Sequence, residues 1–289
     1  MTSRPYFAAL TVLLMNLAAG AEVRSGYDLK LMTFNVRYGT ADDGPDAWEH
    51  RRDLLVETIR NADPGILGTQ ECLEFQAEYI QQQLPEYRWI GMGRDTGALG
   101  EMTALFYKKS VLAPVEMGHF WLSEKPEEPG SVSWDSSLTR MVTWARFYHR
   151  REHTFFTVFN THFDHKGVVA REESAKALAK RTKDFSTDDP VIVLGDFNSV
   201  AETSKPWDTL REAGFKDAWL EAKEKAGPET TWSGFGKEPQ QTGPHRIDWI
   251  LTRGPIQVER AEIITINKAG RYPSDHFPVT AMLALKAEP

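Results

Sequence analysis

The chain has 289 residues, of which 41% are hydrophobic and 26% charged, and these proportions argue against a wholly disordered or fibrous protein. The formal net charge is −7 at pH 7, whereas proteins that bind the phosphate backbone of nucleic acids usually carry net positive charge. The single cysteine, Cys72, excludes an internal disulfide and a cysteine-rich metal site.

The first 21 residues have the pattern of a secretory signal peptide. Arg4 precedes an apolar run from Tyr6 to Ala19, and Ala19-Gly20-Ala21 is a small-x-small cleavage pattern. The run is short for a membrane span, and the alternative is a buried first helix. We therefore expect an exported protein, periplasmic or extracellular, whose mature chain is one monomeric domain over 22–289 without a transmembrane helix.

A series of segments rich in Val, Ile, Thr, Phe and Trp predicts β-strands. In chain order these segments are Leu29–Val36, Ile66–Thr69, Trp89–Gly91, Thr103–Tyr107, Thr143–Tyr148, Thr154–Asn160, Val191–Gly195, Arg246–Leu251, Ala261–Ile266 and Phe277–Leu285. Helical spacing of apolar residues predicts helices over Ala47–Ala62, Leu73–Leu84 and Gly167–Phe185. Strands outnumber helices and some follow one another closely, which favours a mixed α/β domain over a strictly alternating parallel one.

Polar side chains gather where these strands end or begin. The segments that carry them are Asn35, Gln70-Glu71, Asn160-Thr161-His162, Asp196-Phe197-Asn198, Arg246-Ile247-Asp248 and Ser274-Asp275-His276. Each alone is typical of a turn, but strand ends in a packed sheet converge on one crevice. Carboxylates and amides suit a hard divalent ion such as Mg²⁺ or Mn²⁺, and histidines beside them suit proton transfer.

Taken in order, these segments resemble the endonuclease/exonuclease/phosphatase superfamily, the DNase I-like metallophosphoesterases. The resemblance extends from about Leu29 to Leu285. It implies a four-layer α/β sandwich, in which two packed and mainly antiparallel β-sheets are flanked by helices. It also implies Mg²⁺-dependent cleavage of a phosphate ester, with Mn²⁺ as a possible substitute.

The resemblance assigns a role to each strand-end residue. Glu71 is the expected metal ligand, and Asn35 is its neutral partner, which binds the metal or its water. Asp196 orients or deprotonates the attacking water, Asn198 holds the phosphate, and His162 is an imidazole of the catalytic site.

His276 is a second candidate for the base or for a contact to the transition state. An acid that fixes and charges its ring would let the imidazolium stabilise negative charge on phosphorus. Asp275 and Asp248 are both candidates for that acid, and the sequence leaves the choice open.

Four further residues are candidates for substrate binding: Arg140 as a phosphate clamp, Asp164 and His165 on the leaving-group side, and Trp232 as a stacking surface. Each has a structural alternative, namely a buried salt bridge for Arg140, a helix start for Asp164 and His165, and loop packing for Trp232.

Glu101 precedes the apolar strand predicted at Met102–Tyr107. In the resembled family an acid at this place pairs with the motif histidine, here His162. The resemblance therefore predicts a contact between Glu101 and His162 that fixes the tautomer of the ring. A surface glutamate at the end of a loop is the alternative.

The sequence does not identify the substrate, because that choice depends on loops 40–46, 123–133 and 234–244, which contain no recognisable motif. The first interpretation is a phosphodiesterase or phosphatase that acts on a small molecule or a lipid headgroup. The second is a nuclease, such as a deadenylase-like exonuclease acting on single-stranded nucleic acid. A non-catalytic binding module is disfavoured because every identified motif position is filled.

Overall fold

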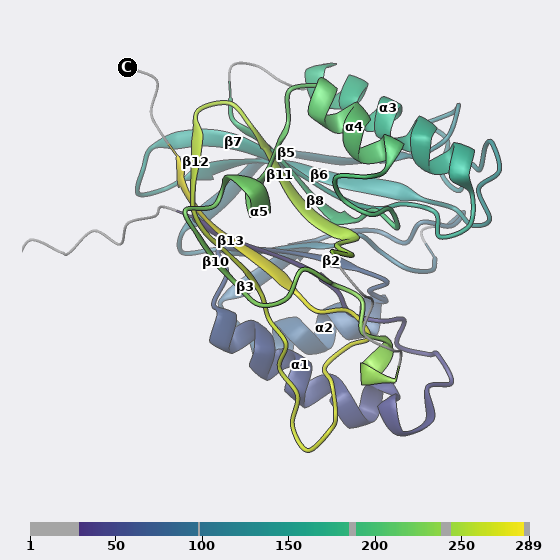
Figure 1. Ribbon diagram of the computed structural model, residues 1–289, viewed down its shortest axis with the longest axis vertical. Helices are drawn as coiled ribbons and strands as arrows, with labels where there is room; N and C mark the ends of the chain where they lie inside the picture. Colours follow the sequence, from purple (N-terminus) through teal and green to yellow (C-terminus); the bar gives the residue numbers. More distant parts are fainter. Residues whose placement is uncertain (1–28, 98, 185–188, 238–243, 286–289) are drawn as a thin grey trace, which may run out of the picture.

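The computed structural model describes residues 29–97, 99–184, 189–237 and 244–285, so the leader expected over 1–21 lies outside the described residues. Two β-sheets pack face to face, and helices cover the outer face of each sheet (Figure 1). The four-layer α/β sandwich predicted from the sequence is thereby confirmed.

The first sheet has seven strands. The pairings β1–β2 and β10–β12 are parallel, and the other neighbours within the described sheet run antiparallel. In spatial order the strands are β10 (Glu224–Ala226), β12 (Ile256–Ile263), β13 (Val279–Leu285), β1 (Leu29–Asn35), β2 (Ile66–Gln70), β4 (Leu105–Lys108) and β3 (Tyr87–Ile90).

The second sheet has six strands, and β7–β8 is its one parallel pairing among the residues described. In spatial order these are β5 (Leu112–Trp121), β6 (Met141–His149), β7 (Thr154–His162), β8 (Val191–Asp196), β11 (Asp248–Arg253) and β9 (Lys216–Asp217). The sequence analysis did not predict β5. This edge strand contains Pro114 at a register shift, where an irregular edge tolerates a residue without an amide proton.

The predicted helices are confirmed as α1 (Trp48–Ala62), α2 (Glu74–Gln83) and α3 (Val168–Asp184). Helices α1 and α2 cover the first sheet, whereas α3 and α4 (Lys205–Glu212) cover the second (Figure 1). Short turns complete the domain: α5 (Ala218–Glu221), η1 (Gly44–Asp46) and η2 (Gly234–Gly236). Within the described ranges, none of the helices combines the length and apolarity needed to cross a lipid bilayer.

The twofold periodicity of the strands positions the polar residues. In β1, Leu29 and Leu31 face the layer between the sheets, while Met32 and Phe34 pack against the helices. Asn35 continues the inter-sheet side of β1 and is fully buried there. Strands β7, β8 and β11 follow the same rule, so the apolar inter-sheet layer turns polar at one end.

The two sheets approach closely just beneath that polar end. A side chain at Gly68 would place its Cβ 2.0 Å from Leu194 Cδ1 and 2.9 Å from Asn160 Cγ of the opposite sheet, so both buried neighbours would have to shift. Asn160 Nδ2 donates to the carbonyl of Thr69 at 2.9 Å, and Gln70 Nε2 donates to Asn160 Oδ1 at 2.7 Å. These amide contacts hold the strand ends of both sheets in a fixed relation.

Candidate active site

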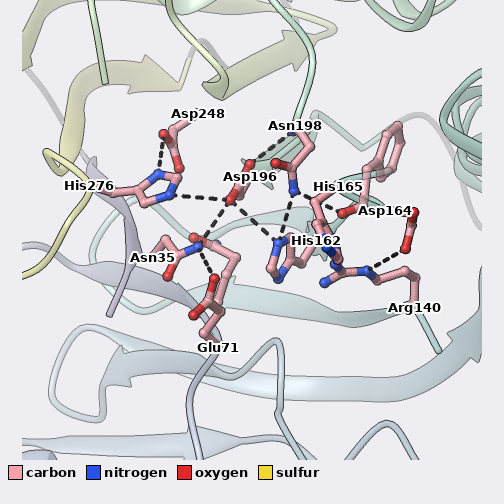
Figure 2. Close-up of polar contacts among 12 residues, drawn as sticks. Asn35, Glu71, Arg140, His162, Asp164, His165, Asp196, Asn198, Asp248 and His276 are labelled. Carbon is pink, nitrogen blue, oxygen red and sulfur yellow. Dashed lines mark hydrogen bonds and ion pairs between the residues drawn. The ribbon is translucent and has the colours of Figure 1, made fainter. Parts of the chain in front are cut away.

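Three polar residues lie side by side on adjacent strands of the second sheet. Asp196 on β8 is the register partner of His162 on β7 and of Asp248 on β11. Residues in one register row point to the same face of a sheet. Here that face is turned toward the other sheet, and the row lies at the polar end of the inter-sheet layer. Figure 2 shows Asp196 at the centre of the resulting cluster.

The Asp196 carboxylate is buried and contacted from several directions. It accepts hydrogen bonds from Asn35 Nδ2 at 3.0 Å and from the Asn198 amide nitrogen at 2.9 Å. Its Oδ2 atom lies 3.4 Å from His162 Nε2 and 3.8 Å from His276 Nε2. Burial, followed by the negative charge of Asp248, raises the pKa of Asp196 to about 7. An acid with such a pKa is suited to accept a proton near neutral pH.

His276 is oriented by Asp248 and not by its sequence neighbour Asp275. His276 Nδ1 lies 2.9 Å from Asp248 Oδ2, which settles the choice that the sequence left open. Burial favours the neutral ring, but Asp248 and Asp196 outweigh it and raise the pKa of His276 well above its usual value. A charged imidazolium therefore faces the cavity beside Asp196.

His162 has the opposite electrostatic environment. Burial, together with the positive charges of Arg140 and Arg94, lowers its pKa well below the usual value. Asn198 Nδ2 donates to the Phe163 carbonyl at 3.0 Å and lies 3.1 Å from His162 Nε2, a contact that requires an unprotonated acceptor. The site thus pairs a neutral imidazole with a charged one, an arrangement that divides acid and base roles.

Glu71 approaches the cluster from the first sheet. It follows β2 in a left-handed conformation (φ 58°), which is strained for a glutamate and turns the chain sharply after the strand. Its carboxylate accepts from Asn35 Nδ2 at 3.0 Å and from the Tyr38 amide at 2.9 Å. Asn35 therefore bridges the carboxylates of Glu71 and Asp196 in this arrangement.

Arg37 is a site residue that the sequence analysis did not select, although it lies two residues after Asn35. Its guanidinium forms two hydrogen bonds with Asp43, at 3.0 and 2.7 Å. It also lies 3.8 Å from Asp275 and 4.0 Å from Glu71. Asp275 is thus paired with a fixed cation on the rim of the cavity.

The donor set fits a divalent cation. Several carboxylates converge here, and Asp248 Oδ1 is buried without a hydrogen-bond partner. Asp196, Asp248 and His276 could group around an ion by distance alone, but a protonated His276 has no free lone pair to coordinate a metal. Glu71, which lines the cavity, is the carboxylate better placed to hold one.

Arg140 lies on the far side of His162 and is almost fully buried. Its Nη2 atom is 3.1 Å from His165 Nδ1, and its Nε atom is 3.5 Å from Asp164. Its Nη1 atom is buried and has no hydrogen-bond partner, although the residue lines the cavity. The position of Arg140 on the cavity wall agrees with its predicted role as a phosphate contact.

Asp164 was a candidate for the leaving-group side, with a helix start as the alternative, and the structure places it behind Arg140 at the start of α3. It is 1% exposed and does not line the cavity. Its Oδ1 atom accepts from the amides of Lys166 and Gly167 at 2.9 and 2.7 Å, just before α3. It therefore organises the start of α3 and supports Arg140.

The predicted residues surround one cavity of about 630 Å³. Asn35, Asp248 and Asp164 lie behind its wall, where they hold residues that face it. The sequence analysis missed Arg37, Tyr38 and His245, because residues in loops carry no periodic signal. The predicted residues that line the cavity are Glu71, Glu101, Arg140, His162, His165, Asp196, Asn198, Trp232, Asp275 and His276.

The predicted contact between Glu101 and His162 is wrong. Both carboxylate oxygens of Glu101 accept from the Arg94 guanidinium, each at 2.8 Å. A backbone hydrogen bond from Arg94 to Glu101 closes the loop between them, so the arginine is already opposite the carboxylate. A bidentate guanidinium is a stronger partner than an imidazole that neighbouring arginines keep neutral.

Comparison with known proteins agrees with this geometry. Residues 32–276 match the model of the Endonuclease/Exonuclease/phosphatase family. The chain belongs to the endonuclease/exonuclease/phosphatase family. Members of this family include phosphatases and nucleases, and the protein is accordingly an enzyme that acts on phosphate ester bonds.

Three relatives illustrate the range of the family. A family member of known structure from Bacteroides thetaiotaomicron is 33% identical, with a TM-score of 0.84 over 90% of this chain and 98% of the other. The mannosyl-6-phosphatase of Bacteroides thetaiotaomicron is also 33% identical, with a TM-score of 0.82 over 89% and 99%. Nocturnin of Drosophila melanogaster is 24% identical over 87% of this chain, which spans 46% of Nocturnin.

Loss of the Glu101 carboxylate should reduce stability. Glu101→Gln leaves the Arg94 guanidinium, which is 10% exposed, with one neutral acceptor in place of a charged pair. We expect a loss of about 1.5–3 kcal/mol in the free energy of unfolding, measured by urea denaturation. Glu128→Gln breaks the exposed Lys125–Glu128 pair and serves as the control. Equal stability of Glu101→Gln and the control would contradict the assignment.

Loss of either central group should abolish most of the activity. We expect Asp196→Asn and His276→Ala each to lower kcat at least about 100-fold, while the surface variant His50→Ala keeps the wild-type rate. A near-normal kcat in either variant would refute these roles.

The raised pKa of Asp196 also predicts how stability depends on pH. Because the pKa is raised to about 7, ionisation of Asp196 in the folded protein removes stability as pH rises from about 4 to 7. The Tm of metal-free Asp196→Asn minus the Tm of metal-free wild type should therefore be larger at pH 8 than at pH 5.

Proposed function

We propose that the protein is an exported, Mg²⁺-dependent phosphatase that hydrolyses a phosphomonoester of a small molecule by attack of water. The observation that carries the proposal is that two positive groups, Arg140 and the imidazolium of His276, line one cavity of about 630 Å³ together with the candidate metal ligand Glu71. A monoester carries one more non-bridging oxygen and more negative charge than a diester. Similarity to a mannosyl-6-phosphatase over nearly the whole chain supports this class of substrate.

The residues of the chain divide the reaction among them. Asp196 accepts the proton of the attacking water, and Asn35 together with the Asn198 amide holds its carboxylate in place. Asp248 keeps His276 charged, so the imidazolium stabilises the negative charge that develops on the phosphate oxygens. The Arg140 guanidinium and neutral His162 bind the phosphate from the opposite side.

Glu71 would hold the metal, because its carboxylate reaches the cavity and hard oxygen donors suit Mg²⁺. A bound Mg²⁺ would neutralise charge on the phosphate and orient the substrate. Asn35 and the Tyr38 amide fix both oxygens of Glu71, so the ligand is already in place before the metal binds.

A nuclease is the second candidate, because the family model that the chain matches is described by endonucleases and exonucleases as well as phosphatases. Trp232 on the cavity wall offers a surface on which a base could stack. Against this, Arg37 and Arg140 are the only lysines or arginines among the described residues that line the cavity, and Arg37 is already paired with Asp43. A nucleic-acid backbone requires a longer basic track.

Export is the part of the proposal that rests on sequence alone. The apolar run and the Ala19-Gly20-Ala21 pattern support it. A mature protein recovered from the periplasm or medium should begin at Glu22, which terminal sequencing would show. Recovery of the uncleaved chain from the cytoplasm would refute export and leave the catalytic proposal untouched.

Metal removal should abolish activity reversibly. EDTA-treated protein is expected to regain its rate with Mg²⁺ or Mn²⁺, because the carboxylate cluster needs a cation to bind a phosphate. Glu71→Gln should raise the metal concentration needed for half the maximal rate, whereas Glu74→Gln, exposed on α2, should not. Full activity of the metal-stripped protein would overturn the mechanism.

A substrate panel tests the reaction itself. We expect kcat/KM to be higher for p-nitrophenyl phosphate and mannose 6-phosphate than for bis-p-nitrophenyl phosphate, sphingomyelin, or single-stranded RNA and DNA. Arg140→Gln should lower the rate of monoester hydrolysis more than any residual rate of diester hydrolysis, because it removes a positive group from the phosphate, which is more negatively charged in a monoester. The exposed variant Arg150→Gln is the control. Faster cleavage of an oligonucleotide than of either monoester would favour the nuclease.

A further inference from the structure

Arg51 is a charged residue on the buried face of α1. It lies between Trp48 and Leu55, where helical spacing predicts an apolar side chain. Its side chain is fully buried, and every hydrogen bond that it donates goes to a backbone carbonyl. Burial lowers the pKa of Arg51 to about 10, so the guanidinium remains charged at neutral pH.

The guanidinium joins two separate loops of the cavity wall. In the loop after β1, its Nη1 atom donates to Val36 at 2.7 Å, Nη2 donates to Arg37 at 3.0 Å, and Nε donates to Asp46 at 2.9 Å. In the loop before β13, Nη1 also donates to Pro273 at 3.0 Å. Pro273 is 222 residues from Arg51 in sequence, yet both loops meet on the side chain of Arg51.

A third loop places an aromatic ring beside the same group. The Arg51 guanidinium lies 5.3 Å from the Trp48 ring and 5.8 Å from the Phe235 ring. Phe235 has a left-handed conformation (φ 59°) in η2, the yellow-green turn beside α1 in Figure 1. The amides of Ser233 and Gly234 donate to the Asp275 carbonyl, at 2.7 and 3.0 Å, so this turn is also tied to the loop before β13.

All three loops supply residues to the active cavity. The loop 36–46 carries Arg37 and Tyr38, the loop 231–237 carries Trp232, and the loop 272–277 carries Asp275 and His276. A guanidinium has several donors in a rigid plane, so it can satisfy carbonyls that point inward from different loops. A lysine offers its donors from one point and cannot span the same set.

We propose that Arg51 is a positioning residue that holds these three loops in the arrangement in which Arg37, Trp232 and His276 face one cavity. Loss of the guanidinium would leave these four backbone carbonyls without their donor, so the loops that carry them are the segments expected to loosen. Its effect on turnover rests on the proposed function, whereas its effect on the loops does not.

Hydrogen–deuterium exchange and kinetics on the full chain test this role. We expect Arg51→Lys and Arg51→Met to increase amide exchange in 36–46, 231–237 and 272–277 together, without change in α3 or β7. The value of kcat should fall between about 10- and 100-fold, the scale that misplaced catalytic groups produce. Arg52→Lys is the matched control, since Arg52 packs over the Tyr79 ring at 4.8 Å on another side of the helix.

Wild-type exchange in the three loops of Arg51→Lys would overturn the proposal. A uniform increase across the whole domain would overturn it too, because that result describes a general loss of stability. If the wild-type protein turns over no phosphate ester, the proposed function fails, and local exchange in the Arg51 variants still decides the positioning role.

Discussion

The burial of Asp196 between His162 and Asp248 in one register row is the constraint on which the site depends. Strand pairing fixes the three residues on one face of the second sheet, so none can turn away without breaking the sheet. Two carboxylates in a buried row repel each other, and the protein balances them with His276 and with hydrogen bonds from neighbouring amides. The charge of this row is therefore compensated by groups from other strands and loops, and not by groups within the row itself.

This constraint also separates the two imidazoles. His276 faces Asp248 and Asp196 and becomes charged, whereas His162 faces Arg140 and Arg94 and stays neutral. The same side chain thus serves opposite purposes within one cavity, and the difference comes from neighbours that other strands and loops supply. Left-handed residues at the ends of β1, β2 and β8, namely Arg37, Glu71 and Asn198, show that backbone strain accompanies this convergence.

Most strands and three helices were predicted from local periodicity, whereas the four layers were predicted from the family resemblance that the ordered motifs carry. Alternation in β1 places Leu31 and Phe34 on opposite faces of the strand, and the packing of the rest of the chain decides that Leu31 faces the other sheet. The ordered motifs likewise identified Glu71, His162, Asp196 and His276, which the structure places around one cavity. Edge strand β5 was missed because its proline and its register shift erase the periodic signal.

Sequence by itself therefore determined the fold class, the family and the chemical types gathered at the strand ends, since short-range pattern and motif order carry that information. Only the tertiary structure decided which groups touch. In the structure, His276 contacts Asp248 and not its sequence neighbour Asp275, and Glu101 pairs with Arg94 and not with His162. Loops that are distant in sequence meet at Arg51. Such pairings follow from side-chain direction and from competition among charges in a buried space, and neither is encoded in the spacing of residues along the chain.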